Sequence, residues 1–128
     1  MVIKSPQILV AEANSKIKTI SPDEAFKMVS ENKCNLIDIR DAVELQKFGR
    51  IEKSFHISRG LLEFSIHPES AYVQDEKLDP NKEMLLFCAA GGRSALAANT
   101  LKEMGFEKVS HIEGGFAAMQ NSEFKVVK

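Results

Sequence analysis

The chain has 128 residues, a length that suits one domain with a single hydrophobic core. Its apolar fraction of 44% and its charged fraction of 27% are ordinary for a soluble globular protein. The formal net charge is −1 and charges of both signs are interspersed, which excludes the clustered basic residues of a nucleic-acid or membrane-surface protein. We therefore expect no nucleic-acid and no membrane partner.

The N-terminus and the two cysteines indicate the compartment. Residues 1–6 lack the features of a secretory signal, and the apolar runs are too short to span a bilayer, so we expect a cytoplasmic protein. Cys34 and Cys88 are too few for a disulfide framework, and a bridge between them is disfavoured in a reducing compartment. The three histidines are scattered, so we interpret them as packing or surface residues rather than zinc ligands: His56, His67 and His111.

In chain order, short apolar runs typical of strands alternate with helical patterns, which predicts a parallel sheet built from βα units. The first half is predicted to contain a helix over 6–14, a strand over 16–20, a helix from residue 22, a strand over 35–39 and a short helix over 41–48. The helix start at residue 22 has a clear signal, because Ser21 suits the N-cap, Pro22 the first turn and Glu24 a capping box.

In the second half, residues 69–82 give no clear element beyond a turn at 79–82. The predicted elements are a strand over 54–57, a helical segment over 59–66, a strand over 84–88, a helix over 92–104, a strand over 108–112 and a short helix over 114–119, before a frayed tail. The helix over 92–104 should bury Ala97, Leu101 and Met104 and end at Gly105. The prediction is an α/β fold with about five mainly parallel strands and helices on both faces.

Cys88 stands between the clearest strand and the clearest helix. Ligands of open α/β sheets bind at this kind of strand end, and backbone amides of the first helical turn can converge there on a negative charge. The sequence continues through a loop whose residues suit a thiolate: Ala89, Ala90, Gly91, Gly92, Arg93 and Ser94. The glycines permit close backbone approach, Arg93 adds a positive charge and Ser94 a hydroxyl, and each of these lowers the pKa of a thiol. A lone cysteine is more often a small buried hydrophobe, but this order of residues favours a nucleophile.

At this loop the chain resembles the rhodanese (sulfurtransferase) family, and the resemblance extends from about residue 19 to residue 119. The family loop is usually Cys-Arg-x-Gly-x-Arg-Ser/Thr, which Cys88, Gly91, Arg93 and Ser94 match. Further matching segments are residues 36–40 with Glu44, Gly49-x-Ile51, His56-Ile57 and Glu113-Gly114-Gly115. The resemblance implies a single rhodanese-like three-layer domain over residues 1–128, with a core at about 19–119, an N-terminal helical extension and a short C-terminal tail.

The resemblance also implies a mechanism and supporting residues. Cys88 would take sulfane sulfur from a donor such as thiosulfate, form a persulfide, and pass the sulfur to a thiol or another nucleophile. It implies no metal or organic cofactor, and partners that are a small-molecule donor and a thiol acceptor, or a protein in either role. Asp38 and Arg40 would form a structural ion pair under the loop. Two residues depart from the family pattern: Ala89 replaces a common Arg, which weakens the case for thiosulfate, and Met119 replaces a common Trp.

Two alternatives stay open at this point. A cysteine phosphatase or arsenate reductase uses a related loop, but phosphatases have Cys-x5-Arg, whereas four residues separate Cys88 from Arg93. A non-catalytic module with the same fold could bind a partner, since fold does not fix function. Arg59 follows the strand over 54–57 and is a candidate for the rim of the site, with a solvated arginine as the simpler interpretation.

Overall fold

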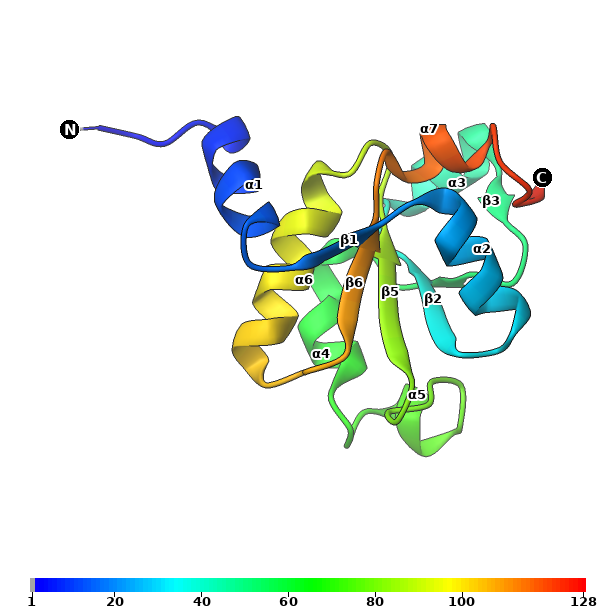
Figure 1. Ribbon diagram of the computed structural model, residues 1–128. Helices are drawn as coiled ribbons and strands as arrows, with labels where there is room; N and C mark the ends of the chain where they lie inside the picture. Colours follow the sequence, from blue (N-terminus) through cyan, green and yellow to red (C-terminus); the bar gives the residue numbers. More distant parts are fainter. Residues whose placement is uncertain (1) are drawn as a thin grey trace.

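The computed structural model describes residues 2–128 as alternating strands and helices (Figure 1). The strands are β1 (Lys18–Ile20), β2 (Cys34–Asp38), β3 (Arg50–Ile51), β4 (Phe55–His56), β5 (Glu83–Phe87), β6 (Val109–Ile112) and β7 (Val126–Val127). The helices are α1 (Pro6–Asn14), α2 (Pro22–Ser30), α3 (Ala42–Phe48), the 3-10 turn η1 (Arg59–Leu61), α4 (Leu62–Ile66), α5 (Ala71–Gln74), α6 (Gly92–Met104) and α7 (Gly115–Met119).

Five strands form one sheet in the order β1-β6-β5-β2-β4, and every neighbouring pair is parallel. β5 is the central strand, with Leu86 opposite Ile37 of β2 on one side and opposite His111 of β6 on the other. A central parallel strand is covered on both faces, which explains why β5 and the residue after it are almost continuously apolar. The predicted α/β fold is confirmed.

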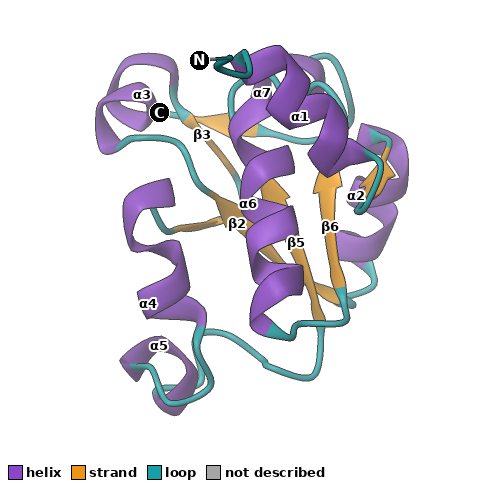
Figure 2. Ribbon diagram, turned by 90° about the vertical axis from the view of Figure 1, so that its left-hand side faces the viewer, coloured by secondary structure: helices purple, strands orange, loops and turns teal. Residues whose placement is uncertain are grey.

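The helices cover the sheet on its two faces (Figures 1 and 2). Alternate residues of β5 point to opposite faces, so each face has its own core. Met84 and Leu86 pack with the buried face of α6 and with α4, in the cluster that also contains Cys88. Leu85 and Phe87 pack in the other cluster, with residues of α2 and α7.

The predicted helix over 92–104 has the predicted bounds, and Gly105 ends it in the left-handed conformation, with φ 113°. The prediction for its buried face is only partly right. Ala97 and Leu101 are fully buried, but Met104, the last residue of the helix, is 41% exposed. The described chain, residues 2–128, contains no helix with the length and apolar character that a membrane crossing requires.

Two segments differ from the prediction. The tail does not fray: β7 pairs antiparallel with β3, with Val126 opposite Ile51. The buried side chains of Ile51 and Phe124 join the core on the α2 and α7 face, and this burial holds the last residues in place. In the segment 69–82, which the sequence left without a clear element, the short helix α5 begins after Ser70, whose hydroxyl accepts a hydrogen bond from the Val73 amide.

Candidate functional site

The loop after β5 wraps the sulfur of Cys88 with backbone amides. Gly91 has φ 108°, a left-handed conformation that favours glycine and turns the chain into α6. As a result the Gly91 amide lies 3.1 Å from Sγ and the Ser94 amide lies 3.3 Å from it. The Ser94 hydroxyl is 3.5 Å from the same sulfur. Three hydrogen-bonding groups thus surround one sulfur atom at the start of a 13-residue helix.

The pKa of Cys88 is set by two opposing effects. Burial raises it, since only 1% of the residue is exposed. The side chain and amide of Ser94 and the amides of Gly91 and Ala90 donate hydrogen bonds that favour the thiolate, and together they outweigh burial. The net result is a Cys88 pKa below that of an ordinary thiol. The site therefore favours a nucleophilic sulfur.

Arg93 makes no hydrogen bond to the sulfur of Cys88, although the charges of the two groups interact. Its guanidinium pairs with Glu44 of α3 in a bidentate arrangement, with both N–O distances at 2.9 Å. Glu44 also accepts a hydrogen bond from the Asp41 amide and so caps α3. The hydrogen bond from Arg93 lowers the pKa of Glu44 to about 2, and the pair raises the pKa of Arg93. The positive charge is therefore neutralised locally, and Arg93 connects α6 to α3.

Behind the loop, α7 supports the backbone of Cys88. The Phe116 amide donates a 2.7 Å hydrogen bond to the Cys88 carbonyl, and the Ala117 amide donates one of 3.1 Å to the Ala89 carbonyl. This close approach requires glycine at position 115, because a Cβ there would lie 2.4 Å from the Cys88 carbonyl oxygen. The loop is thus held between the start of α6 and the start of α7.

Asp38 and Arg40 form a buried ion pair beside this support. The Arg40 guanidinium donates to both oxygens of Asp38, the shortest contact being 2.8 Å, and to the Gly49 carbonyl at 3.0 Å. The same guanidinium lies over the Phe116 ring, 3.9 Å from its centre. Because Phe116 contacts the Cys88 carbonyl, the pair lies one residue away from the loop backbone.

Arg59 points elsewhere. Its guanidinium contacts Glu63 at 2.8 Å and the Thr100 hydroxyl at 3.4 Å. Thr100 lies two turns along α6 from Gly92, so this charge lies on the flank of the helix. The simpler interpretation, a partly exposed surface arginine, describes this geometry, and the rim position proposed from sequence has no contact to support it.

His111 was interpreted from sequence as a packing or surface residue, yet it lies beside the loop. It is 2% exposed, and its Nδ1 is 2.8 Å from the Ser94 hydroxyl. Its position on β6, directly next to the central strand, was the only sequence signal, because the carboxyl ends of neighbouring parallel strands meet at one edge. The Glu44–Arg93 pair gave no local signal, since 49 residues separate its members.

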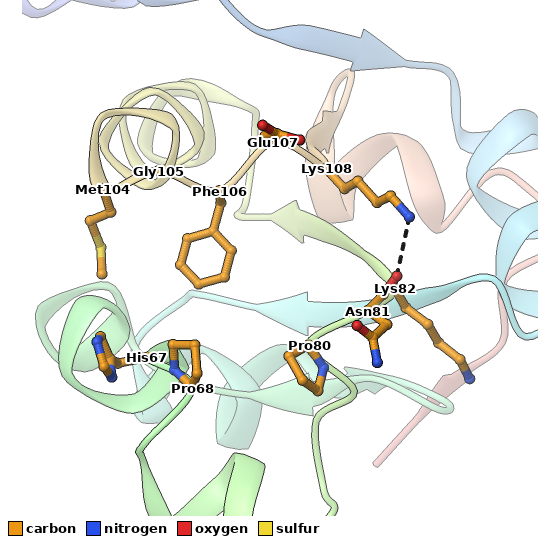
Figure 3. Close-up of a pocket in the computed structure, with 10 residues that line it drawn as sticks. All are labelled: His67, Pro68, Pro80, Asn81, Lys82, Met104, Gly105, Phe106, Glu107 and Lys108. Atoms are coloured by element: carbon orange, nitrogen blue, oxygen red, sulfur yellow. Dashed lines mark hydrogen bonds between the residues drawn. The ribbon is translucent and has the colours of Figure 1, made fainter.

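Two hollows differ in their relation to the loop. One of about 400 Å³ lies against it and is lined by residues that include Ala90, Gly91, Gly92 and His111. Another, of about 550 Å³, lies near the end of α6 and the beginning of β5 (Figure 3). Its lining includes Met104, Phe106 and Pro68, and it lies at the opposite edge of the sheet from Cys88. Only the first can take part in chemistry at the sulfur.

Cys34 has different surroundings. It is a free, half-buried cysteine at the start of β2, and no disulfide connects it with Cys88. Burial and the charge of Glu83 raise the pKa of Cys34 to about 11, against a smaller opposing effect of Lys82. Cys34 is therefore a poor nucleophile at neutral pH.

The chain is similar in sequence to a known protein family and to several characterised proteins. The family model "Rhodanese-like domain" matches residues 21–122. The tRNA uridine(34) hydroxylases of Chlamydia felis and Chlamydia caviae are each 31% identical over 102 residues, which is 79% of this chain but only 30% of theirs. The chain thus corresponds to less than a third of the length of these relatives.

Two solved structures cover most of the chain. A protein of unknown function from Rhodopseudomonas palustris, "Possible Tyrosine Phosphatase", is 35% identical with a TM-score of 0.84, covering 99% of this chain and 97% of that one. The polysulfide-sulfur transferase homodimer of Wolinella succinogenes is 32% identical with a TM-score of 0.73, covering 94% of this chain and 85% of that one.

Proposed function

The chain belongs to the rhodanese-like domain family, and we propose that it is a sulfurtransferase that carries sulfane sulfur as a persulfide on Cys88. The observation that carries this proposal is the set of donors around one sulfur: the Gly91 amide at 3.1 Å, the Ser94 amide at 3.3 Å and the Ser94 hydroxyl at 3.5 Å. Preorganised donors of this kind stabilise a sulfur anion as an oxyanion hole stabilises oxygen.

The reaction would have two displacement steps at sulfur. First, the Cys88 thiolate attacks the sulfane sulfur of the donor, a Cys88–sulfur bond forms, and the bond between that sulfur and the rest of the donor breaks. With thiosulfate the leaving group is sulfite. Second, an acceptor thiolate or cyanide attacks the outer sulfur, and the Cys88 thiolate leaves with its original charge. The loop amides favour the anion at the start and at the end of this cycle.

The surroundings of the sulfur favour a linear polysulfide over thiosulfate as the donor. Residue 89 is an alanine, and the charge of Arg93 is taken up by Glu44, so neither offers a free cation to a sulfonate group. Only 1% of Cys88 is exposed, which suits the narrow end of a sulfur chain better than a branched donor. The similarity to the Wolinella succinogenes polysulfide-sulfur transferase supports the same donor class.

The similarity to the Rhodopseudomonas palustris protein raises phosphate-ester hydrolysis as a second activity. The loop argues against it. Four residues separate Cys88 from Arg93, and the guanidinium is bound bidentately to Glu44 rather than directed at the loop. A phosphate dianion needs a positively charged partner in the loop. Without the Arg93 guanidinium, only neutral backbone amides would face the two negative charges of the phosphate.

A transfer assay tests the proposal. Polysulfide and thiosulfate are supplied as donors with cyanide or dithiothreitol as acceptor, and p-nitrophenyl phosphate is tested separately. The wild type and Cys34→Ser should transfer sulfur at similar rates, and Cys88→Ser should be inactive. Hydrolysis of the phosphate ester without sulfur transfer would replace the proposal with a phosphatase. Absence of both activities in folded wild-type protein would favour a binding module.

A further inference from the structure

His111 is a buried ionisable group that the two displacement steps leave without a role. Its two ring nitrogens are both engaged. Nδ1 lies 2.8 Å from the Ser94 hydroxyl, which in turn is 3.5 Å from the sulfur of Cys88. Nε2 lies 3.0 Å from the Asn14 side-chain oxygen and 3.0 Å from the Thr19 hydroxyl. A continuous line of polar atoms therefore runs from the sulfur through Ser94 and His111 to α1.

The acceptor at Asn14 fixes the direction of these hydrogen bonds. An amide oxygen only accepts, so Nε2 of His111 carries the hydrogen and Nδ1 is free to accept. The Ser94 hydroxyl then donates to Nδ1, and its oxygen accepts from the thiol of Cys88. Each donor in the line points away from the sulfur and toward the imidazole. This is the arrangement in which a proton can move from the thiol to the ring.

We infer that His111 is a positioning residue that receives, through the Ser94 hydroxyl, the proton lost by Cys88 when the thiolate forms. The S–H bond of Cys88 breaks as Ser94 gains that proton, and Ser94 gives its own hydrogen to Nδ1. The products are a thiolate, an unchanged serine and an imidazolium, so atoms and charge balance. Ser94 then donates to the sulfur, Nδ1 donates to Ser94, and Nε2 still donates to Asn14. The role in sulfur transfer rests on the proposed function.

The surroundings leave the thiolate as the main partner for an imidazolium. Burial lowers the pKa of His111, which favours the neutral ring before the thiol ionises, so the imidazolium needs a nearby negative charge to persist. From α1 and β1 it meets the uncharged Asn14 and Thr19, and from α6 it meets Ser94. Of the residues lining the adjacent hollow, His111 and the exposed Glu113 are the titratable ones. The charged neighbour on α6, Arg93, is paired with Glu44.

The two contacts of Nε2 come from residues outside the matched family segment. The family model begins at residue 21, whereas Asn14 and Thr19 precede it. α1 packs along α6 (Figure 2). Its last residue, Asn14, contacts His111. The N-terminal helix thus extends the site rather than only covering the core.

The pH dependence of Cys88 alkylation tests this inference without any sulfur donor. His111→Asn keeps an oxygen that can accept from Ser94 but cannot take up a proton at neutral pH. With iodoacetamide, the inflection of this variant should move by about one pH unit toward that of an ordinary thiol, and at pH values below both inflections it should react about tenfold more slowly than the wild type. Asn14→Ala should shift the inflection in the same direction by less. His67→Asn, at an exposed histidine near the far edge of the sheet, is the matched control and should match the wild type.

A nuclear magnetic resonance titration of the His111 ring gives a second readout that does not depend on folding of the His111 variant. In the wild type the imidazolium should persist to higher pH than in Cys88→Ala, where no thiolate can stabilise it. Identical titration of His111 in these two proteins, or an unchanged alkylation profile in folded His111→Asn, would overturn the inference. Sulfur loading, measured separately by mass, distinguishes this failure from failure of the sulfurtransferase proposal.

Discussion

The two cysteines of this chain titrate in opposite directions because their hydrogen-bonding surroundings differ. Burial raises the pKa of both thiols. At Cys34 burial acts with the negative charge of Glu83, and the pKa reaches about 11. At Cys88 burial is outweighed by donors from Ser94, Gly91 and Ala90, and the pKa falls. At the scale of single residues, amides and one hydroxyl decide which sulfur is reactive.

We predict that the rate of Cys88 alkylation rises with pH through an inflection below that of an ordinary thiol, because the folded protein favours the thiolate. Cys34 should become reactive only near pH 11. Peptide-resolved labelling with iodoacetamide across pH measures both sites at once. Arg93→Ala should move the Cys88 inflection less than Ser94→Ala, since Glu44 neutralises Arg93 and Ser94 contacts the sulfur. A larger effect of Arg93→Ala would refute this account of the electrostatics.

Ala89 stands where an arginine would offer a positive charge to an anionic donor. Ala89→Arg should lower the KM for thiosulfate about five- to thirtyfold, because it restores a charge-assisted contact to a dianion. This factor corresponds to a gain of roughly 1–2 kcal/mol in binding free energy. The kcat should change much less, because the added charge stabilises bound thiosulfate and the transition state by similar amounts. Steady-state kinetics at low and high salt measure the effect, which screening should reduce. Unchanged thiosulfate kinetics at low salt would mean that residue 89 does not face the donor.

At the scale of elements, the contact between α7 and the loop depends on the absence of a side chain at position 115. Gly115→Ala would place a Cβ against the Cys88 carbonyl and force φ of 56° on an alanine. We expect a loss of about 3 kcal/mol in the free energy of unfolding, measured with urea, and a loss of sulfur loading.

Gly105→Ala is the matched control: φ of Gly105 is 113°, but no atom lies within 4 Å of the added Cβ. It should cost about 1–2 kcal/mol and leave loading intact, and equal effects on loading would contradict this role of Gly115.

The elements that the sequence predicts well are those with strong local signals. β5 is an uninterrupted apolar run, and α6 ends at a glycine that adopts the left-handed conformation, so the bounds of α6 are those predicted. β7 was missed because two residues, Val126 and Val127, have no periodicity of their own. They become a strand only by pairing with Arg50 and Ile51, more than 70 residues earlier in the chain, as the numbering shows.

At the scale of the molecule, the Asp38–Arg40 pair joins the sheet, the end of α3 and α7. Both side chains are at most 1% exposed. Asp38→Asn should lower the free energy of unfolding by roughly 3–5 kcal/mol, because it leaves the Arg40 charge buried without a counter-charge. Glu12→Gln, which removes the exposed pair with Lys4, should change it by less than about 1 kcal/mol. Similar small losses in both variants, measured by urea unfolding, would show that the buried pair does not hold the fold.

The candidate site was predictable only in part, for the same reason as the fold. Cys88 and its loop are contiguous, so their order in the sequence indicates a loop whose backbone amides stabilise a thiolate. The partners of Arg93 and Ser94 are distant in sequence, since Glu44 is 49 residues from Arg93 and His111 is 17 residues from Ser94. The sequence therefore offered no indication that Glu44 binds Arg93 or that His111 contacts Ser94, and His111 was interpreted as a packing or surface residue. Only the tertiary contacts show where these side chains point.

We propose that the sulfur of Cys88 accepts and holds sulfane sulfur. The most direct measurement is peptide-resolved mass spectrometry of the wild type after brief incubation with polysulfide and trapping of persulfides. We predict the mass of one added sulfur atom on the peptide that contains Cys88, its removal by a thiol, and no addition in Cys88→Ser. Addition mainly on Cys34, or loading of Cys88→Ser to the wild-type level, would contradict it.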